Sequence, residues 1–464
     1  MKAPDPYHYV PHAFGGRVGI ARTDITPPPT IYHRNWGAAE SDNADGIHRS
    51  LYAAAMAIQD AGATETLVFV AADAGWFRCD ADEWAVRSVV LDALDLPPAN
   101  LIINLSHTHA GPILSPENIE RPGGELLAAY FAMFTDRIVT AVRHAIANLA
   151  PATITWAVGR CSLAANRDLP DPNGDRYLTG FNAAGTADDT VLVGRIANAD
   201  GRTIGTLVNY ACHPTTLAWS NRLISPDYIG AMREVVEDNT ADAPCLFMLG
   251  ACGELGAIES HVGAVEIAEK NGRQLGFAVM TVLESMLPAG QALAYDRTIE
   301  SGALLATWRR EERQPSDVML SKCITVEYRI KADYPTVGDV EKELATTTDR
   351  FQIERLERKL KLVREICAGE LHVSHVWLWR LGDSIWIGVP GEPYSVLQTT
   401  LRAAFPDYTI IVMNLVNGWG GYFPPVEMYD LDIYPVWQTP YDRGSLEQLK
   451  DACRAGIGEI VNGG

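Results

Sequence analysis

The stretch TLVFVAADAGW (residues 66–76) is a continuous apolar run that ends at Asp73. Its branched residues and its length are typical of a β-strand that is buried on both faces. A helical stretch, DEWAVRSVVLDALDL (82–96), leads from it to a second apolar run, NLIINLSHTHAGP (100–112). This order of strand, helix and strand predicts an α/β protein.

The same alternation continues along the chain. A long amphipathic helix is predicted over 124–149, and apolar runs predict strands within 203–214 and 243–256. Nearer the N-terminus we expect a strand within 17–29 and a helix over about 47–58. We therefore expect an α/β layered sandwich of mixed β-sheets flanked by helices, with the functional site at strand ends.

The C-terminal part adds an insertion and further strands. Residues 340–367 are charged and carry apolar residues at helical spacing, which predicts a surface helical insertion without a catalytic role. Beyond it, a β-hairpin around Gly382 leads to a turn that carries Glu392, and a buried strand then opens into a glycine-rich aromatic loop. No linker, charge block or repeat divides the sequence, so we expect a single catalytic domain over 1–464.

The composition excludes several classes of partner. The 38 basic and 58 acidic residues give a net charge of −20, which opposes nucleic acid and anionic membranes. No run approaches the roughly 20 apolar residues of a spanning helix, so we expect no stable membrane anchoring. The eight cysteines form no CxxC pair and the N-terminus lacks the apolar core of a signal peptide, so we expect a cytoplasmic protein.

Residues able to bind a metal or move protons stand at the ends of the predicted strands. A catalytic Zn²⁺ site needs about three nitrogen or oxygen ligands and an open position for water. The HTH motif alone is a weak signal for a metal, because histidines near strand ends are common and these two could be hydrogen-bonded residues at the rim of a sheet. The candidates are Asp73, His107, His109, His213, Glu392 and Tyr422.

The glycine-bounded segment GACGELGA (250–257) has two interpretations. Its backbone N–H groups could cradle an oxyanion, or the segment could be the tight turn that a strand end requires. We favour a turn that contacts the site. Cys252 lies in this segment, but no Cys-His-Asn pattern supports a nucleophile, and free cysteines are usually small core residues.

Several short motifs, in this order, resemble the N-terminal catalytic domain of the neutral, non-lysosomal ceramidase family. The resemblance runs from about Val18 to Leu449. The motifs are VGIARTDITPP (18–28), GIH (46–48), SHTHAGP (106–112), NR (166–167), ACHPTTL (211–217), GACGELG (250–256), VPGEP (389–393) and NGWGGYFPPVEMYDLDIY (417–434).

The resemblance implies a zinc enzyme that cleaves an amide bond with a metal-activated water. It implies that the zinc ligands are His107, His213, Glu392 and Tyr422. It also gives substrate binding and stabilisation of charge at the scissile carbonyl to His109, Arg167 and Tyr434. Because a ligating imidazole usually donates its other N–H to an acceptor, we expect His48 and Asp73 to support the metal ligands.

The sequence departs from the family in ways that bear on the substrate. Gly256 stands where the family's GDVSPN loop has a serine, and Glu254 replaces the aspartate of that loop. The C-terminal immunoglobulin-like domain and the secretory signal of the ceramidases have no counterpart in the sequence. We therefore expect a small, polar substrate rather than ceramide.

Three functions remain as hypotheses. The first is a zinc-dependent hydrolase that cleaves an N-acyl amide bond of a small molecule. The second is a lactonase or esterase that uses the same metal-activated water, because the metal polarises either carbonyl. The third is a binding protein that keeps a structural metal without catalysis, which the absence of a hydroxyl at Gly256 favours.

Overall fold

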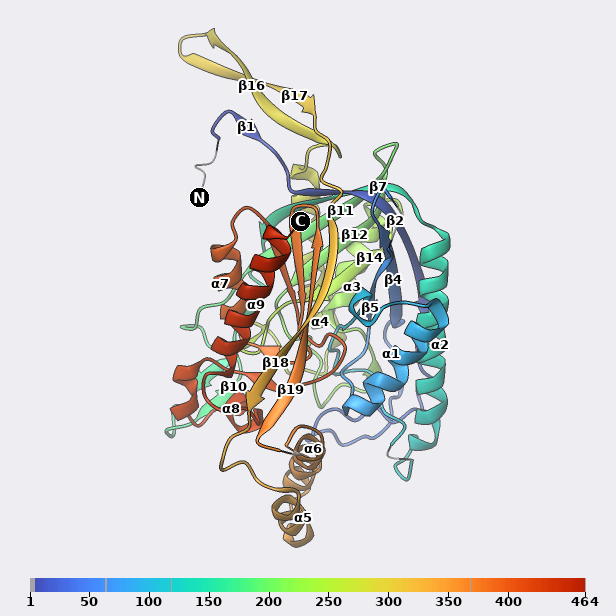
Figure 1. Ribbon diagram of the computed structural model, residues 1–464. Helices are drawn as coiled ribbons and strands as arrows, with labels where there is room; N and C mark the ends of the chain where they lie inside the picture. The colour runs from blue at the N-terminus through green and yellow to red at the C-terminus, as the bar shows by residue number, and fades with distance from the viewer. Residues whose placement is uncertain (1–4, 63–64, 118, 368, 464) are drawn as a thin grey trace.

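Two β-sheets lie face to face in the middle of the protein, and helices cover the outer face of each sheet (Figure 1). The structure, a computed structural model, describes residues 5–62, 65–117, 119–367 and 369–463. Three large clusters of buried apolar side chains fill the spaces between the layers, in the order helix, sheet, sheet, helix. This arrangement confirms the predicted α/β sandwich of mixed sheets.

The larger sheet has eight strands. Its neighbours β5 and β6, and β12 and β14, run parallel, and the other neighbouring pairs are antiparallel. From edge to edge its strands are β14 (Cys245–Leu249), β12 (Thr203–Tyr210), β11 (Thr190–Asn198), β7 (Ala150–Arg160), β2 (Ala13–Asp24), β4 (Tyr52–Gln59), β5 (Leu67–Ala72) and β6 (Leu101–Leu105).

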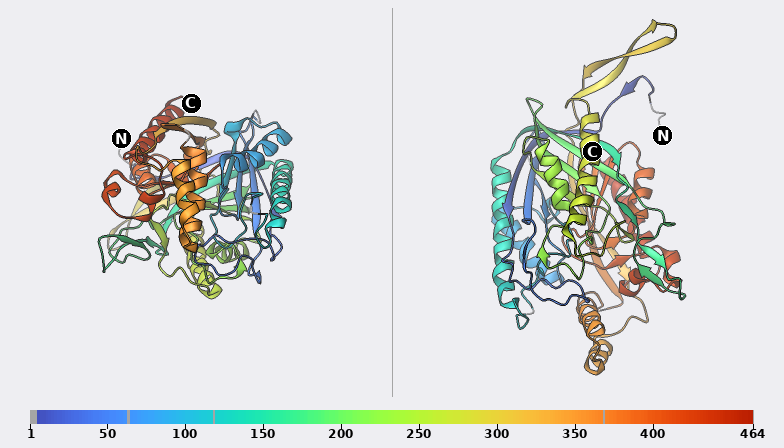
Figure 2. Two further views of the ribbon diagram at one scale, coloured as in Figure 1. Left: turned by 90° about the horizontal axis from the view of Figure 1, so that it is seen from below. Right: turned by 180° about the vertical axis from the view of Figure 1, so that it is seen from behind.

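Four helices cover the outer face of this sheet, as the view from below makes clear (Figure 2). Side chains such as Phe134 and Met232 pack from these helices onto apolar residues of the strands, for example Val70 and Phe247. The helices are α1 (Asp80–Leu94), α2 (Leu127–Ala147), α3 (Tyr228–Asp238) and α4 (Val265–Ser285). The predicted helices 82–96 and 124–149 correspond to α1 and α2.

The smaller sheet has four strands. In order they are β18 (Met319–Arg329), β19 (Leu371–Leu381), β20 (Ser384–Gly388) and β22 (Thr409–Met413), and the helices α7 (Val396–Ala404) and α9 (Ser445–Asn462) cover its outer face. The predicted hairpin between β19 and β20 turns at Gly382, whose φ is 56° and whose added Cβ would meet the Ala13 carbonyl oxygen at 2.2 Å. Glycine is therefore required at this turn.

Central strands are buried on both faces, which explains their continuous apolar runs. In β5, Val68 and Val70 face the helices, while Phe69 faces the second sheet, where it contacts Trp386 edge to face at 5.5 Å. Large aromatic side chains fill the space between the two sheets, and Trp379 and Trp386 are fully buried there. This packing fixes the two sheets against each other.

The predicted helix over 47–58 is wrong, because the segment forms strand β4 in the middle of the larger sheet. Its run of alanines favours a helix by intrinsic propensity. In the sheet, however, Ala53, Ala55 and Ala57 pack beneath the covering helices, while Met56 points to the other sheet. Pairing with two neighbouring strands and burial of both faces override the local preference.

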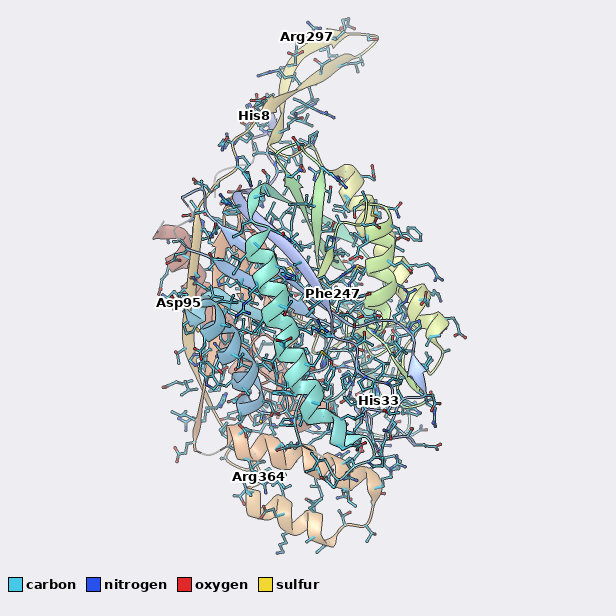
Figure 3. The ribbon with its side chains drawn as sticks, turned by 90° about the vertical axis from the view of Figure 1, so that its right-hand side faces the viewer. His8, His33, Asp95, Phe247, Arg297 and Arg364 are labelled. Carbon is cyan, nitrogen blue, oxygen red and sulfur yellow. The ribbon has the colours of Figure 1, made fainter. Side chains whose placement is uncertain are left out.

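The two ends of the molecule carry different additions (Figure 1). At one end β16 (Gln291–Glu300) and β17 (Leu304–Glu312) form a projecting arm to which β1 (His8–Tyr9) pairs. At the other end α5 (Val337–Thr346) and α6 (Arg350–Ile366) lie between β18 and β19 in sequence, where the helical insertion was predicted. Figure 3 shows Arg297 on the arm and Arg364 on α6, at opposite ends.

Short elements connect the layers and build the loops around the site. They are β3 (Gly46–Ile47), β8 (Ala164–Asn166), β9 (Asp168–Pro170), β10 (Tyr177–Thr179), β13 (Leu223–Ile224), β15 (Leu255–Ala257), β21 (Glu392–Pro393), β23 (Tyr422–Phe423), α8 (Tyr434–Gln438) and the 3-10 helices η1 (Pro98–Asn100), η2 (Gly124–Leu126) and η3 (Val426–Asp430).

Candidate metal centre and catalytic site

Two histidines and a glutamate from separate strand ends converge in the interior. His107 follows β6, His213 follows β12, and Glu392 begins β21 just after β20 of the other sheet. All three side chains are buried, and one nitrogen or oxygen atom of each lies within 4.8 Å of the others. The site therefore draws on the ends of strands from both sheets.

Backbone carbonyls orient both imidazoles. His213 Nδ1 lies 2.7 Å from the Cys252 carbonyl oxygen, and His107 Nδ1 lies 3.3 Å from that of Gly75. A carbonyl oxygen can only accept, so Nδ1 carries the hydrogen in each ring and Nε2 presents its lone pair. Hydrogen bonds of this kind typically orient histidines that bind metals.

The two Nε2 atoms face one oxygen of Glu392. Its Oε2 lies 2.9 Å from His213 Nε2 and 3.4 Å from His107 Nε2. Ligand atoms around a tetrahedral ion with bonds of about 2.0 Å are roughly 3.3 Å apart, so these separations fit a single small cation. Trp419 Nε1 donates to the other oxygen, Oε1, at 3.1 Å and so fixes the orientation of the carboxylate.

The protonation states also fit a cation at this position. Burial and the nearby Arg167 guanidinium lower the pKa of His213 to about 4, so this ring is neutral near pH 7. Burial alone would raise the pKa of Glu392, but the neighbouring His107 and His213 lower it well below its usual range. With its hydrogen on Nδ1, a neutral His213 can share a cation with the Glu392 carboxylate at the 2.9 Å separation of Nε2 and Oε2.

Tyr422 is held beside the carboxylate by main-chain pairing. In the parallel pair β21 and β23, Glu392 is directly opposite Tyr422. The Tyr422 ring stacks with that of His213 at a centroid distance of 6.4 Å, and burial and the Glu392 charge raise the pKa of its hydroxyl. The pairing thus places Tyr422 next to the three clustered side chains, and its role as a fourth ligand stays a prediction.

Arg167 lies against these groups rather than on the open side of the site. Its Nη2 donates to the Gly253 carbonyl at 2.8 Å and to the Tyr422 hydroxyl at 3.1 Å, and it lies 3.2 Å from His213 Nε2. Although burial lowers the pKa of this guanidinium, Tyr422 and Glu392 outweigh the effect and raise it. Arg167 is therefore a fixed positive charge that orients Tyr422.

The metal cluster opens into a narrow cavity of about 60 Å³. Of the residues predicted from the sequence, His109 and Tyr434 line this cavity together with His107, Glu392 and Tyr422. Arg167 does not occur among the cavity-lining residues of the described chain. The structure thus places His109 and Tyr434 where a substrate can reach them and sets Arg167 behind the ligands.

His109 is packed between aromatic rings. Its ring centroid lies 5.0 Å from those of Trp36 and Trp76 and 4.7 Å from that of His107. Both its nitrogens are buried and have no hydrogen-bond partner among the described residues. Burial and the adjacent His107 lower the pKa of His109 well below its usual value, so the ring is neutral and can still exchange a proton with a bound molecule.

The prediction that His48 and Asp73 support the metal ligands is wrong. Asp73 binds the Arg233 guanidinium through two contacts of 2.7 and 2.9 Å. His48 instead contacts Ser225 Oγ at 2.9 Å and a Glu269 carboxylate oxygen at 2.8 Å. Backbone carbonyls fill the supporting role, and the identity of such carbonyls cannot be read from side-chain patterns.

The glycine-bounded segment 250–257 contacts the site through its carbonyl groups. Cys252 and Leu255 accept from His213 Nδ1, and Gly253 accepts from Arg167. The Cys252 thiol is fully buried, and burial raises its pKa well above the usual value, so it is no nucleophile. The segment is thus a turn that contacts the site, as favoured from the sequence.

The two departures in this segment have different surroundings. Glu254 accepts from the Ser395 backbone N–H at 2.9 Å and fastens the turn that follows Glu392. A Cβ added at Gly256 would lie 3.7 Å from Arg167 Cδ and 3.9 Å from Thr215 Oγ1, which are ordinary contacts. A side chain at Gly256 would therefore fit beside Arg167.

Several residues of the cavity wall were not predicted from the sequence. From α6, which was given no catalytic role, Arg358 and Lys361 line the cavity, and their spacing of three residues places them on one face of the helix. The spacing of these two residues is visible in the sequence, but the sequence does not show that α6 lies next to the site. The other missed wall residues are Trp76, Arg78, Trp419 and Gln438.

Comparisons with known proteins agree with the fold. A curated neutral ceramidase from Pseudomonas aeruginosa is 26% identical over 226 residues, which are 46% of this chain and 32% of that protein. The match thus spans about a third of the length of this curated relative.

The described chain contains no helix that is both long and apolar enough to cross a membrane.

Solved structures resemble almost the whole chain. One titled as a ceramidase complexed with C2 has a TM-score of 0.67 at 16% identity and covers 94% of this chain and 74% of that one. The neutral ceramidase of Pseudomonas aeruginosa has a TM-score of 0.66 at 17% identity, with coverage of 94% and 73%. At this identity the likeness concerns the fold. The family model for the neutral/alkaline non-lysosomal ceramidase N-terminal region matches residues 17–249, and the chain therefore belongs to this family.

Proposed function

We propose that this protein is a zinc-dependent hydrolase that cleaves an N-acyl amide bond of a small, polar substrate. The observation that carries the proposal is the convergence of His107 and His213 on one oxygen of Glu392, in a chain of the ceramidase family. The ligand set would be completed by Tyr422, which is opposite Glu392 in the β21–β23 pair. When bound there, zinc lowers the pKa of a water and polarises the scissile carbonyl.

The residues of the chain then have separate roles. Tyr434 lines the cavity, and burial raises the pKa of its hydroxyl, so at neutral pH it is an O–H donor. We assign it the stabilisation of negative charge on the carbonyl oxygen, for which one well-placed donor contributes about 3 to 4 kcal/mol. His109, with two unpartnered nitrogens facing the same space, would pass a proton to the leaving nitrogen.

Arg167 acts through its neighbours in this proposal. Its hydrogen bond to the Tyr422 hydroxyl and its position 3.2 Å from His213 Nε2 support a positioning role. The expectation that it contacts the developing oxyanion stays a prediction. A cytoplasmic location is likewise proposed, supported by the absence of disulfides among the eight cysteines of the described chain.

The experiment that tests the function is an assay of the chelator-treated and zinc-reconstituted protein on matched N-acyl amides and lactones. Hydrolysis of the amides, lost on chelation and recovered with zinc, is expected. Turnover of lactones alone would replace the amidase proposal by the lactonase alternative. Stable zinc binding without turnover of either series would favour the binding-protein alternative.

A further inference from the structure

Three basic side chains line the cavity beside the metal cluster: Arg78, Arg358 and Lys361. Arg78 lies in the loop between β5 and α1, and the other two lie on α6. Glu392 is the one acidic residue on the described wall of this cavity, and both imidazoles already face it. The cavity therefore carries an excess of positive charge in a chain whose net charge is −20.

Among the described residues, the hydrogen-bond partners of the two arginines are neutral. Arg78 Nη2 donates to Asn35 Oδ1 at 2.6 Å, and Arg358 Nη2 donates to the Asn35 backbone oxygen at 2.7 Å. The Arg78 guanidinium also lies 4.2 Å above the ring of Trp76, which forms part of the same wall. Neither arginine forms a salt bridge with an aspartate or glutamate of the described residues.

Two of the nearby carboxylates are engaged elsewhere. Glu354 lies 2.7 Å from Arg34 Nε, and Glu117 forms a close ion pair with Lys361. Of the three cations, Lys361 is thus already neutralised by the protein. Arg78 and Arg358 are the two charges on the wall that a bound molecule can neutralise.

Without a bound anion, holding these two guanidinium groups close together costs free energy. Burial, and then the like charge of Arg358, lower the pKa of Arg78 to about 9, although Tyr32, Asp82 and Glu354 act in the opposite direction. Two buried or half-buried cations without a counter-ion are rare, because desolvation and mutual repulsion act together. Functional sites commonly hold such unfavourable charge for a ligand of opposite sign.

We propose that Arg78 and Arg358 bind a carboxylate group of the substrate, so that the enzyme acts on N-acyl compounds that carry a free acid. The inference rests on the proposed function, because the same cavity contains the metal cluster and His109. Guanidinium groups bind carboxylates through paired, charge-assisted hydrogen bonds, which gives both affinity and orientation. The Trp76 ring, between Arg78 and the two histidines, positions this subsite next to the reacting bond.

Equilibrium binding tests the subsite without relying on turnover. The probes are levulinate, which has a methylene in place of the amide nitrogen of N-acetylglycine, and its uncharged counterpart levulinamide. Calorimetry on the zinc-loaded protein should give binding of levulinate at least about tenfold tighter than that of levulinamide. Arg358→Gln and Arg78→Gln should each remove most of this preference.

Arg364→Gln is the matched control. Arg364 is an exposed residue of α6 that pairs with Glu341 at 2.8 Å and lies outside the cavity wall, so this variant removes one positive charge from the same helix. It should keep the wild-type preference. Equal binding of the two probes to the wild type, or a preference that survives in both cavity variants, would overturn the proposal; the latter would place the carboxylate on the metal.

A parallel assay separates this subsite from the proposed function. N-acetylglycine and N-acetylglycinamide share the scissile amide and differ in charge. If levulinate is preferred but neither amide is hydrolysed, the subsite stands and the hydrolase proposal fails. If both amides are hydrolysed with equal kcat/KM and the probes bind equally, the hydrolase proposal stands and the carboxylate subsite fails.

Discussion

Two clusters in this protein combine histidine, glutamate and arginine, and they differ in how the imidazoles are oriented. In the first, His48 has a side-chain partner on each nitrogen, Ser225 and Glu269, and Arg49 binds the same carboxylate at 2.8 Å. In the metal centre, His107 and His213 use Nδ1 for backbone carbonyls and turn both Nε2 atoms to Glu392.

The difference shows that residue types alone do not identify a metal site. The first cluster is complete, because each charge and each nitrogen has a partner in the protein. In the second, two imidazole nitrogens and a carboxylate oxygen converge within 4.8 Å of one another, which leaves a position that suits a cation. Substitutions in the two clusters and at their neighbours test this contrast.

Replacing one histidine in each cluster should give the largest difference, which is in zinc content. His213→Ala removes a metal ligand, so bound zinc should fall from about one ion per chain to below about a tenth, with loss of activity. His48→Ala breaks a hydrogen-bonded cluster at the surface of α4 and should leave the metal in place. Metal analysis after gel filtration measures both, and similar zinc contents in the two variants would remove the distinction between the clusters.

His109→Gln separates catalysis from metal binding within the site. The variant should keep its zinc but lose roughly 10²- to 10³-fold in kcat, because the proton carrier in the cavity is gone. His261→Gln is the control, since His261 contacts the same Trp36 ring, at 5.8 Å, and lies outside the cavity wall. Steady-state kinetics would contradict the role of His109 if both variants retained the wild-type kcat.

The two buried glutamates Glu392 and Glu254 have pKa values that are shifted in opposite directions. Glu392 is held ionised, whereas burial raises the pKa of Glu254 from 4.5 to about 7 despite hydrogen bonds from Ser395. A raised pKa in the folded state means that the contribution of Glu254 to stability is complete below pH 4.5 and is lost as the pH rises through about 7.

Glu254→Gln removes this titration. Between pH 5 and 8 the free energy of unfolding of the wild type should fall relative to that of the variant by roughly 2 to 3 kcal/mol. Urea unfolding of both proteins at the two pH values measures the difference. A difference that does not change with pH would show that Glu254 titrates normally in the folded protein.

Gly256→Ser should have the smallest effect. The space beside Arg167 and Thr215 accommodates a Cβ, so the free energy of unfolding should change by less than about 1 kcal/mol and zinc content should not change. Thermal unfolding and metal analysis check this. A loss of more than about 2 kcal/mol would mean that glycine is required here by the fold.

The layers of the fold could be predicted because their signals are local. Continuous apolar runs such as the segment of β5 are typical of strands with two buried faces, and their alternation with helices defines an α/β sandwich. The alanine-rich segment of β4 misled the prediction, because its conformation is decided by β2 and β5 on either side. No local pattern in the segment carries that information.

The candidate site also has features that are local in the sequence and features that depend on long-range contacts. Positions at predicted strand ends marked His107, His213, Glu392 and Tyr422 as candidates, and the family resemblance assigned them as ligands; the structure brings them together. The register that places Glu392 opposite Tyr422, and the carbonyls that orient the imidazoles, are long-range backbone features. The same holds for Arg78 and Arg358, which meet only because α6 folds over the loop after β5.

The attachment of α5 and α6 has a consequence for how the protein can change over evolution. Both helices lie between β18 and β19, neighbouring antiparallel strands, and a small apolar cluster around Val340, Leu356 and Val363 packs them together. Such a unit can be lengthened, shortened or exchanged while the strands that carry the metal ligands keep their register. Relatives with different insertions at this point would then be expected to differ in the part of the cavity wall that α6 provides, Arg358 and Lys361, while keeping the clustered histidines and glutamate.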